Sequence, residues 1–122
     1  MKTCLIVEDN EISREVYEHH VDLLGFKSIK AKDAIEALEK CKESMPEVII
    51  LDWHMPDMDG FEFIVNLKKL ENYSDPTIIM CTCDEKAQII DETTLHSGIK
   101  GFLAKPTYFK DLENKFSELK LI

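Results

Sequence analysis

Five short apolar runs, alternating with segments of helical periodicity, constrain the fold of this chain more than any other feature. The first run, Thr3–Val7, is followed at once by the charged residues Glu8 and Asp9, which indicates a buried strand. Because such runs are apolar at successive positions, both faces of the sheet must be covered by helices. The alternation predicts an α/β fold with a doubly wound, five-stranded parallel sheet and five helices.

Caps, stop residues and apolar spacing set the expected boundaries. Strands are expected at 3–7, 26–31, 48–51, 76–81 and 101–104, and helices at about 11–24, 33–45, 61–70 and 85–96, with a last helix after residue 107. We expect Gly25 to end the first helix, and Asp33 and Thr107 to be N-cap residues. The length favours one domain over residues 1–122.

Apolar positions at helical spacing predict which helix faces are buried. In the first helix, His20 is spaced to lie on the buried stripe, which favours a satisfied core histidine over a metal ligand. The stripes expected in the first, second and last helices are, in turn, Ile12, Val16, Leu23 and Leu24; Ala34, Ala37, Leu38, Cys41 and Met45; and Phe109, Leu112, Phe116 and Leu119.

Composition restricts the possible partners. Asp and Glu outnumber Lys and Arg by 24 to 15, and the formal net charge of −9 opposes direct contact with nucleic acid. No apolar run is long enough to span a bilayer and no leader opens the chain, so we expect a cytoplasmic location without membrane contact. Cys4, Cys41, Cys81 and Cys83 lack the C-x-x-C spacing of zinc ribbons, which favours buried free thiols over a metal site or a disulfide.

Polar residues follow four of the five expected strands at the point where each strand ends. Glu8 and Asp9 follow the first strand and Asp52 the third. Thr82 follows the fourth strand and Lys105 the fifth. Because the carboxyl ends of parallel strands share one rim, where ligands bind, we expect these five side chains to form one site.

Three carboxylates in one site repel one another, by roughly 4 kcal/mol for each ionised pair at about 4 Å and an effective dielectric constant of ~20. A Mg²⁺ ion together with Lys105 would balance them, and Mg²⁺ prefers oxygen ligands. Asp52 alone could be a nucleophile, a metal ligand or the residue that ends a strand. Beside a divalent cation and an ammonium group it is suited to attack a phosphoryl donor, with Glu8 and Asp9 as metal ligands and the Thr82 hydroxyl as a hydrogen-bond donor.

Three motifs lie at the expected strand ends: LIVEDN (residues 5–10), LDWHMPDMDG (residues 51–60) and GFLAKP (residues 101–106). Together with Thr82 after the fourth strand, they resemble the motifs of the receiver domain of two-component response regulators, and the resemblance covers essentially the whole chain. The second and third motifs are particularly similar to those of the single-domain chemotaxis regulator. The resemblance implies a flavodoxin-like fold.

The resemblance also implies a function. Asp52 would receive a phosphoryl group from a histidine kinase or phosphotransfer protein, in a Mg²⁺-dependent reaction whose only chemistry is self-catalysed gain and loss of that phosphate. The metal ligands would be Glu8, Asp9, Asp52 and the backbone carbonyl of His54. Thr82 and Lys105 would contact the phosphoryl group.

Phe102 occupies the aromatic switch position of the family. By the resemblance it would turn inward on phosphorylation and alter the surface formed by the fourth helix, fifth strand and fifth helix. That surface would bind a downstream effector or a fused output domain. A monomer and a weak dimer are both compatible with this family, as are a stand-alone regulator and a receiver belonging to a longer chain.

Several positions depart from the commonest family pattern. Cys83 stands where alanine or glycine is usual, and we expect it to narrow the approach to the phosphoryl group. Phe102 lacks the hydroxyl of the tyrosine often found there. His54 and Asp84 occupy positions that tune the phosphate lifetime in this family, although a solvated loop histidine is an equally good interpretation of His54.

Two other classes of protein compete with the signalling interpretation. An aspartyl-phosphate phosphohydrolase shares the nucleophile, but it generally needs a second acid soon after it, where this chain has Trp53 and His54. A flavin carrier is disfavoured because the first strand ends in Glu8, Asp9 and Asn10 and offers no phosphate-cradling loop.

Overall fold

The computed structural model describes residues 2–53, 55–82 and 98–122. This part of the chain forms, in order, β1 (Thr3–Val7), α1 (Glu11–Leu23), β2 (Lys27–Ala31), α2 (Ala34–Glu43), β3 (Val48–Asp52), α3 (Gly60–Lys68), β4 (Thr77–Thr82), β5 (Ile99–Ala104) and α6 (Phe109–Glu118). The helix expected at about 85–96 lies outside the described residues. The other expected elements are present, with boundaries that differ by a few residues.

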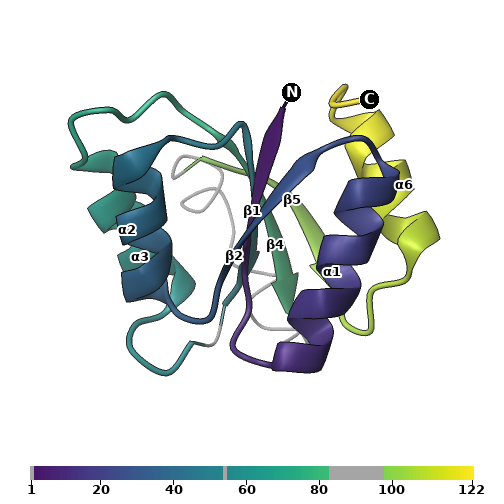
Figure 1. Ribbon diagram of the computed structural model, residues 1–122, viewed down its shortest axis with the longest axis horizontal. Helices are drawn as coiled ribbons and strands as arrows, with labels where there is room; N and C mark the ends of the chain where they lie inside the picture. Colours follow the sequence, from purple (N-terminus) through teal and green to yellow (C-terminus); the bar gives the residue numbers. More distant parts are fainter. Residues whose placement is uncertain (1, 54, 83–97) are drawn as a thin grey trace.

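The five strands form one parallel sheet in the order β2-β1-β3-β4-β5. Figure 1 shows α2 and α3 on one face of this sheet, and α1 and α6 on the other. The expected doubly wound α/β architecture is therefore confirmed. Among the described residues, no helix combines the length and the apolar character needed to cross a membrane.

Successive strand residues point into two separate cores, which explains why the strands are apolar at consecutive positions. Leu5 and Leu51 pack with Phe63 in the core beneath α2 and α3. Ile6 and Ile50 point the other way, into the core beneath α1 and α6. The alternation fixes which strand residues reach the carboxyl rim of the sheet, because a shift of one residue would exchange the two cores.

The buried face of α1 differs from the expected one. Ile12, Val16 and Leu23 are 74%, 44% and 61% exposed, whereas Tyr17 and Val21 are buried against the sheet. The expected stripe was wrong for these three residues, because it left out Val21 and Tyr17, an amphipathic residue with a large apolar ring. Leu24, the fourth residue of the expected stripe, does pack against the core. Helix α1 consequently leaves an apolar strip exposed beside its buried face.

Helix starts and stops agree with the sequence at two of three positions. The Asp33 carboxylate accepts the Glu36 N–H at 2.8 Å and caps α2 as expected. Gly25 follows the end of α1 with a φ of +87°, a conformation that glycine adopts without strain. Thr107, by contrast, does not cap α6: the N-cap is Tyr108, and the Thr107 hydroxyl makes other hydrogen bonds.

His20 is half-buried, and the three cysteines among the described residues are buried. The His20 ring packs 5.4 Å from the ring of Phe109, but its buried Nδ1 atom has no hydrogen-bond partner among the described residues, so the expected satisfied core histidine is wrong in that respect. Cys4, Cys41 and Cys81 are buried free thiols, as expected. Cys83 lies outside the described residues.

Candidate functional site

Three charged side chains from separate strands meet at the carboxyl end of the sheet. Glu8 follows β1, Asp52 is the last residue of β3, and Lys105 follows β5. The Lys105 Nζ atom lies 2.6 Å from Glu8 Oε2 and 3.3 Å from Asp52 Oδ2. Glu8 is 2% exposed and Asp52 8% exposed, so both carboxylates are largely shielded from bulk water.

Asp9 adds a third carboxylate and completes what we call the acidic cluster: Glu8, Asp9 and Asp52. One carboxylate oxygen from each residue lies within 4.8 Å of the others. Asp9 is exposed, which leaves the cluster open to solvent on one side. With three carboxylates beside the Lys105 ammonium group, the donor set is all oxygen and strongly acidic, and hard divalent cations bind such sets. The cluster could therefore bind a metal ion.

Burial and charge shift the pKa values of this site in ways that follow from its geometry. Burial raises the pKa of Glu8, and the hydrogen bond and charge of Lys105 offset this only in part. For Lys105, burial acts to lower the pKa, but the hydrogen bond to Glu8 and the negative charges of Asp52 and Glu8 outweigh it and raise the pKa overall. The lysine is therefore a fixed positive charge at neutral pH.

The start of α1 holds the acidic residues after β1 in place. The Glu8 side chain accepts the backbone N–H of Asn10 at 3.2 Å, and Asn10 in turn caps α1 by accepting the N–H of Ser13. The Arg14 guanidinium donates to the backbone carbonyl oxygen of Glu8 at 2.8 Å. Sequence reasoning did not identify Arg14, although a basic residue one turn into the helix after an acid pair is a usable signal.

The loop between β3 and α3 is fastened at both ends. Asp59 caps α3 by accepting the Glu62 N–H at 2.8 Å. A Cβ atom at Gly60 would lie 3.0 Å from the Trp53 ring, so a glycine fits this close approach. Asp57 reaches α2 and accepts two of its backbone N–H groups. Nothing in the local sequence identifies that partner, which lies more than twenty positions earlier.

Of the remaining expected site residues, the structure describes two, Thr82 and Phe102. Thr82 ends β4 and pairs in register with Ala104, so its backbone lies beside the residue that precedes Lys105. Phe102 is partly buried, and packs against the core beneath α2 and α3. His54, Cys83 and Asp84 lie outside the described residues.

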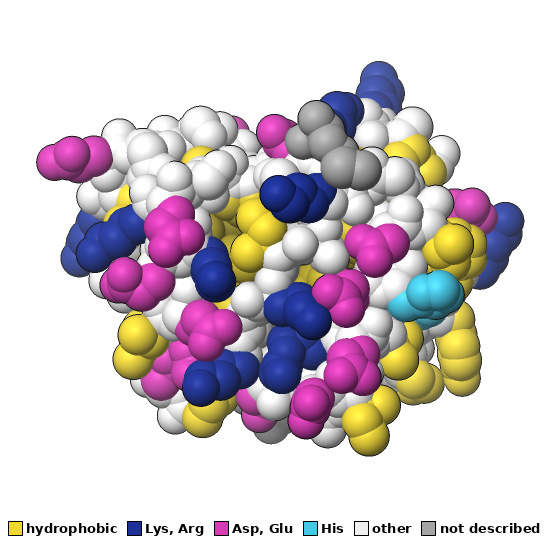
Figure 2. Space-filling model, in the orientation of Figure 1, with side chains coloured by type: hydrophobic (Ala, Val, Ile, Leu, Met, Phe, Trp, Pro, Cys, Tyr) yellow, Lys and Arg dark blue, Asp and Glu magenta, His cyan; other side chains and the backbone are white. Residues whose placement is uncertain are grey.

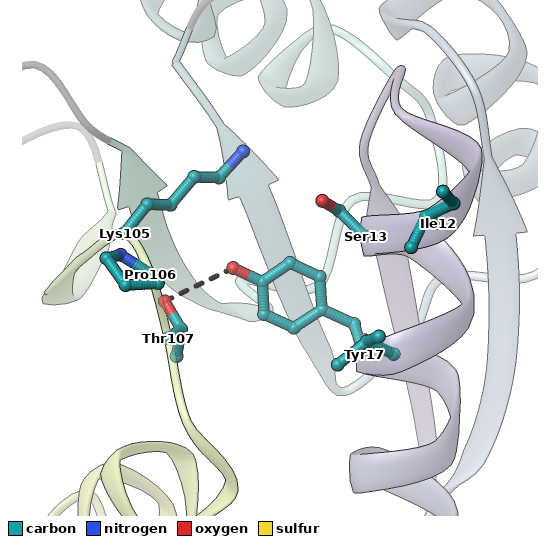
Figure 3. Close-up of a pocket in the computed structure, with 7 residues that line it drawn as sticks. Ile12, Ser13, Tyr17, Lys105, Pro106 and Thr107 are labelled. Carbon is teal, nitrogen blue, oxygen red and sulfur yellow. Dashed lines mark hydrogen bonds between the residues drawn. The ribbon is translucent and has the colours of Figure 1, made fainter.

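A groove of about 470 Å³ adjoins the ion pairs, between α1 and the segment that follows β5. Figure 3 shows its walls: Ile12 and Tyr17 project from the helix, and Lys105, Pro106 and Thr107 lie opposite. The exposed side chains of Ile12 and Val16 thus line the same groove as Lys105. Elsewhere, Figure 2 shows acidic and basic side chains interspersed over the face in view.

A parallel sheet in the order β2-β1-β3-β4-β5, covered by helices on both faces, defines a flavodoxin-like α/β domain, and this one carries an acidic cluster and a lysine at the carboxyl rim. Residues 4–117 match the family model of the response regulator receiver domain, and the chain belongs to that family. The resemblance found in the sequence is thereby confirmed.

The relatives include single-domain and longer proteins. The chain is 30% identical to a chemotaxis protein CheY homolog of Campylobacter jejuni over 118 residues, which are 94% of this chain and 89% of the relative. It is 31% identical over 119 residues to the cyclic di-GMP phosphodiesterase response regulator RpfG of Xanthomonas campestris, of which only 31% is covered. The solved structure of chemotaxis protein CheY4 of Vibrio cholerae is similar over 97% of this chain and 98% of that one, with 30% identity and a TM-score of 0.84.

Proposed function

We propose that this receiver domain accepts a phosphoryl group on Asp52 and changes its partner-binding surface in response. The observation that carries the proposal is the position of the Lys105 ammonium group, which bridges Glu8 and Asp52 within a cluster of three carboxylates. A carboxylate that is buried and paired with a fixed cation is held ready for nucleophilic attack on phosphorus.

Mg²⁺ fits the acidic cluster as the metal. Glu8, Asp9 and Asp52 would supply oxygen ligands, and by the family pattern the backbone carbonyl of His54 would add another. The metal, when bound, supplies positive charge that neutralises the phosphoryl oxygens and the attacking carboxylate. The two net negative charges left by three carboxylates and one lysine match one divalent cation.

The protein's own residues carry the rest of the reaction. A carboxylate oxygen of Asp52 forms a bond to phosphorus, while the bond between phosphorus and the donor's nitrogen or oxygen breaks and the leaving group keeps its electron pair. Lys105 then holds the transferred phosphoryl oxygens, which requires its ammonium group to loosen from Glu8. Thr82, at the end of β4, would donate a hydrogen bond to the same oxygens.

The donor would be a histidine kinase or a phosphotransfer protein, and the groove beside Lys105 is the surface we assign to it. Ile12 and Val16 present exposed apolar area on one wall, and Lys105 marks the end nearest the phosphoacceptor. A donor helix with an apolar face and a phosphorylated histidine would bury that area while delivering its phosphoryl group to Asp52.

The output would be a change in the surface around β5 and α6. Phe102 is only partly buried, and an inward turn of its ring would transmit the change at Asp52 to a downstream effector or an output domain in the same chain. We treat residues 1–122 as one domain and self-catalysed gain and loss of phosphate as its only chemistry. The tuning roles of His54, Cys83 and Asp84, a cytoplasmic location, the lack of nucleic-acid contact and a monomeric or weakly dimeric state remain predictions.

Trp53 provides a direct test, because it is the only tryptophan in the chain and it follows Asp52. We expect Mg²⁺ to change its fluorescence, and acetyl phosphate to change it further only when Mg²⁺ is present. A response to acetyl phosphate that persists after chelation of the metal would contradict the proposal.

A further inference from the structure

We propose that Tyr17 is a positioning residue, whose buried hydroxyl holds the turn that carries Lys105 and so sets where the ammonium group lies relative to Glu8 and Asp52. The inference rests on the proposed phosphoacceptor function, since it assigns a role in the same reaction. Tyr17 lies in α1, outside the three motifs that carry the family resemblance.

The first support is a chain of hydrogen bonds around the lysine. The Tyr17 hydroxyl donates to Thr107 Oγ1 at 3.2 Å (Figure 3). The Thr107 hydroxyl in turn donates to the backbone carbonyl of Ala104 at 3.4 Å. Ala104 and Thr107 flank Lys105 and Pro106. Because the bond from Thr107 to Ala104 is long, it closes the turn only weakly, and the contact from α1 gives the turn a second point of attachment.

The second support is that α1 also holds the acidic side of the site. Arg14 donates to the backbone carbonyl of Glu8, and Tyr17 contacts Thr107. Residues three apart lie on one side of a helix, so both contacts come from the same side of α1. A rigid helix therefore spans the two halves of the Lys105–Glu8 ion pair and sets the distance between them.

The third support is the state of the hydroxyl itself. Tyr17 is 4% exposed and lies among apolar residues of the core beneath α1 and α6. Burial raises the pKa of Tyr17 well above its usual value, so the phenol keeps its proton and remains a donor. Burial likewise raises the pKa of the Cys81 thiol to about 12, against the opposing effect of hydrogen bonds with Tyr17 and Thr107. The protonated hydroxyl thus connects α1 to the turn after β5 through its bond to Thr107.

A purely structural role of the Tyr17 hydroxyl can be distinguished from a positioning role by whether its effect on the reaction depends on Lys105. If the hydroxyl only satisfied buried polar atoms, its removal would lower stability and slow the reaction equally whether or not Lys105 is present. If it positions Lys105, its effect on the reaction must disappear when the lysine side chain is removed.

The test is the rate of Asp52 phosphorylation by acetyl phosphate at saturating Mg²⁺, measured for the wild type, Tyr17→Phe, Lys105→Ala and the double variant. We expect Tyr17→Phe to slow the wild type about three- to tenfold and to have no effect in the Lys105→Ala background. Thr107→Val should reproduce the Tyr17→Phe rate, and Thr107→Ser, which keeps the hydroxyl, should restore nearly the wild-type rate.

Several outcomes would overturn the positioning role. One is a wild-type rate for Tyr17→Phe, and another is equal slowing by Tyr17→Phe with and without Lys105. Where the Lys105→Ala rate falls below detection, equal rates for Thr107→Val and Thr107→Ser would overturn it. A wild type that takes no label on Asp52 would instead overturn the proposed function itself.

Discussion

The Asp57 carboxylate, in the loop after β3, accepts the backbone N–H group of Ile35 at the start of α2, at a distance of 2.8 Å. It also accepts the N–H groups of Ala34 at 3.2 Å and Met58 at 3.0 Å. A carboxylate at a helix N-terminus pairs with N–H groups that the helix leaves free and interacts favourably with the helix dipole. The segment that follows Asp52 is therefore fastened to α2 as well as to α3.

Replacing Asp57 should consequently affect both stability and metal binding. We expect Asp57→Ala to lower the free energy of unfolding by about 1–2 kcal/mol and to weaken Mg²⁺ binding, because the loop beside the acidic cluster loses its attachment to α2. Urea denaturation and a Trp53 fluorescence titration measure the two effects. Glu71→Ala, which removes an exposed carboxylate, is the control, and an equal effect of the two substitutions would contradict this interpretation.

The Lys105 ammonium group pairs with two buried carboxylates, those of Glu8 and Asp52. We expect Lys105→Met to lower the free energy of unfolding in EDTA by about 2–4 kcal/mol, and Mg²⁺ to restore more stability to this variant than to the wild type. Lys110→Met is the matched control, because Lys110 pairs with Glu113 on the surface with 77% of its side chain exposed. A Lys105→Met protein as stable as the wild type in EDTA would refute the role of the ion pairs.

The pKa of Glu8 predicts a pH dependence of stability. Burial raises that pKa above the ordinary value of 4.5, so the folded state holds the proton more tightly than the unfolded chain. The resulting stability is present below pH 4.5 and is lost as the pH rises through the higher, folded-state pKa. The contribution of Lys105, whose pKa is also raised, stays constant over this acidic range.

We therefore expect Glu8 to lower the free energy of unfolding of the metal-free wild type as the pH rises from 4.5 to neutral. In Glu8→Gln, which cannot titrate at this position, the free energy of unfolding should fall less over the same pH range. Urea denaturation in EDTA at several pH values measures the slope. Identical slopes for the two proteins would mean that Glu8 does not titrate in this range.

The groove beside Lys105 should matter for a protein donor and not for a small one. Ile12→Ser should weaken phosphotransfer from a cognate kinase or phosphotransfer protein about tenfold, by removing apolar contact area, while labelling by acetyl phosphate keeps its rate. Leu23→Ser provides a control on the same helix, since Leu23 is also exposed but lies at the far end of α1. Equal losses for the two variants would remove the groove from the donor interface.

The parallel sheet and the convergence of Glu8, Asp52 and Lys105 could be predicted from the sequence because both follow from simple rules. Runs that are apolar on both faces require helices on both sides of a sheet, and residues after parallel strands share one rim. The acidic cluster and the lysine meet as expected. The sheet and the meeting of these side chains depend on the order and direction of the strands. The alternation of strands and helices along the chain nearly determines both.

The contacts that hold the site in place could not be predicted. The burial of Tyr17 was not predicted, because the spacing of apolar residues favoured Ile12 and Val16, and Val16 is the neighbouring position on the helix. Thr107 was expected to cap the last helix because N-cap residues are predicted from local sequence alone. The Asp57 carboxylate accepts a hydrogen bond from the backbone N–H of Ile35, which is distant in the sequence, and no local sequence pattern predicts this contact. Hydrophobic periodicity predicts where helices and strands lie along the chain. The contacts of Tyr17, Thr107 and Asp57 depend instead on which helices and strands pack together.

The most direct measurement of the central claim is mass-spectrometric mapping of the chain after treatment with acetyl phosphate and Mg²⁺. Asp52→Asn, which removes the attacking carboxylate and keeps its size, is the control. We expect one phosphoryl group on Asp52 of the wild type, and no label either in Asp52→Asn or in the wild type with EDTA. Equal labelling of the wild type and Asp52→Asn, or a label on a different residue of the wild type, would contradict the account.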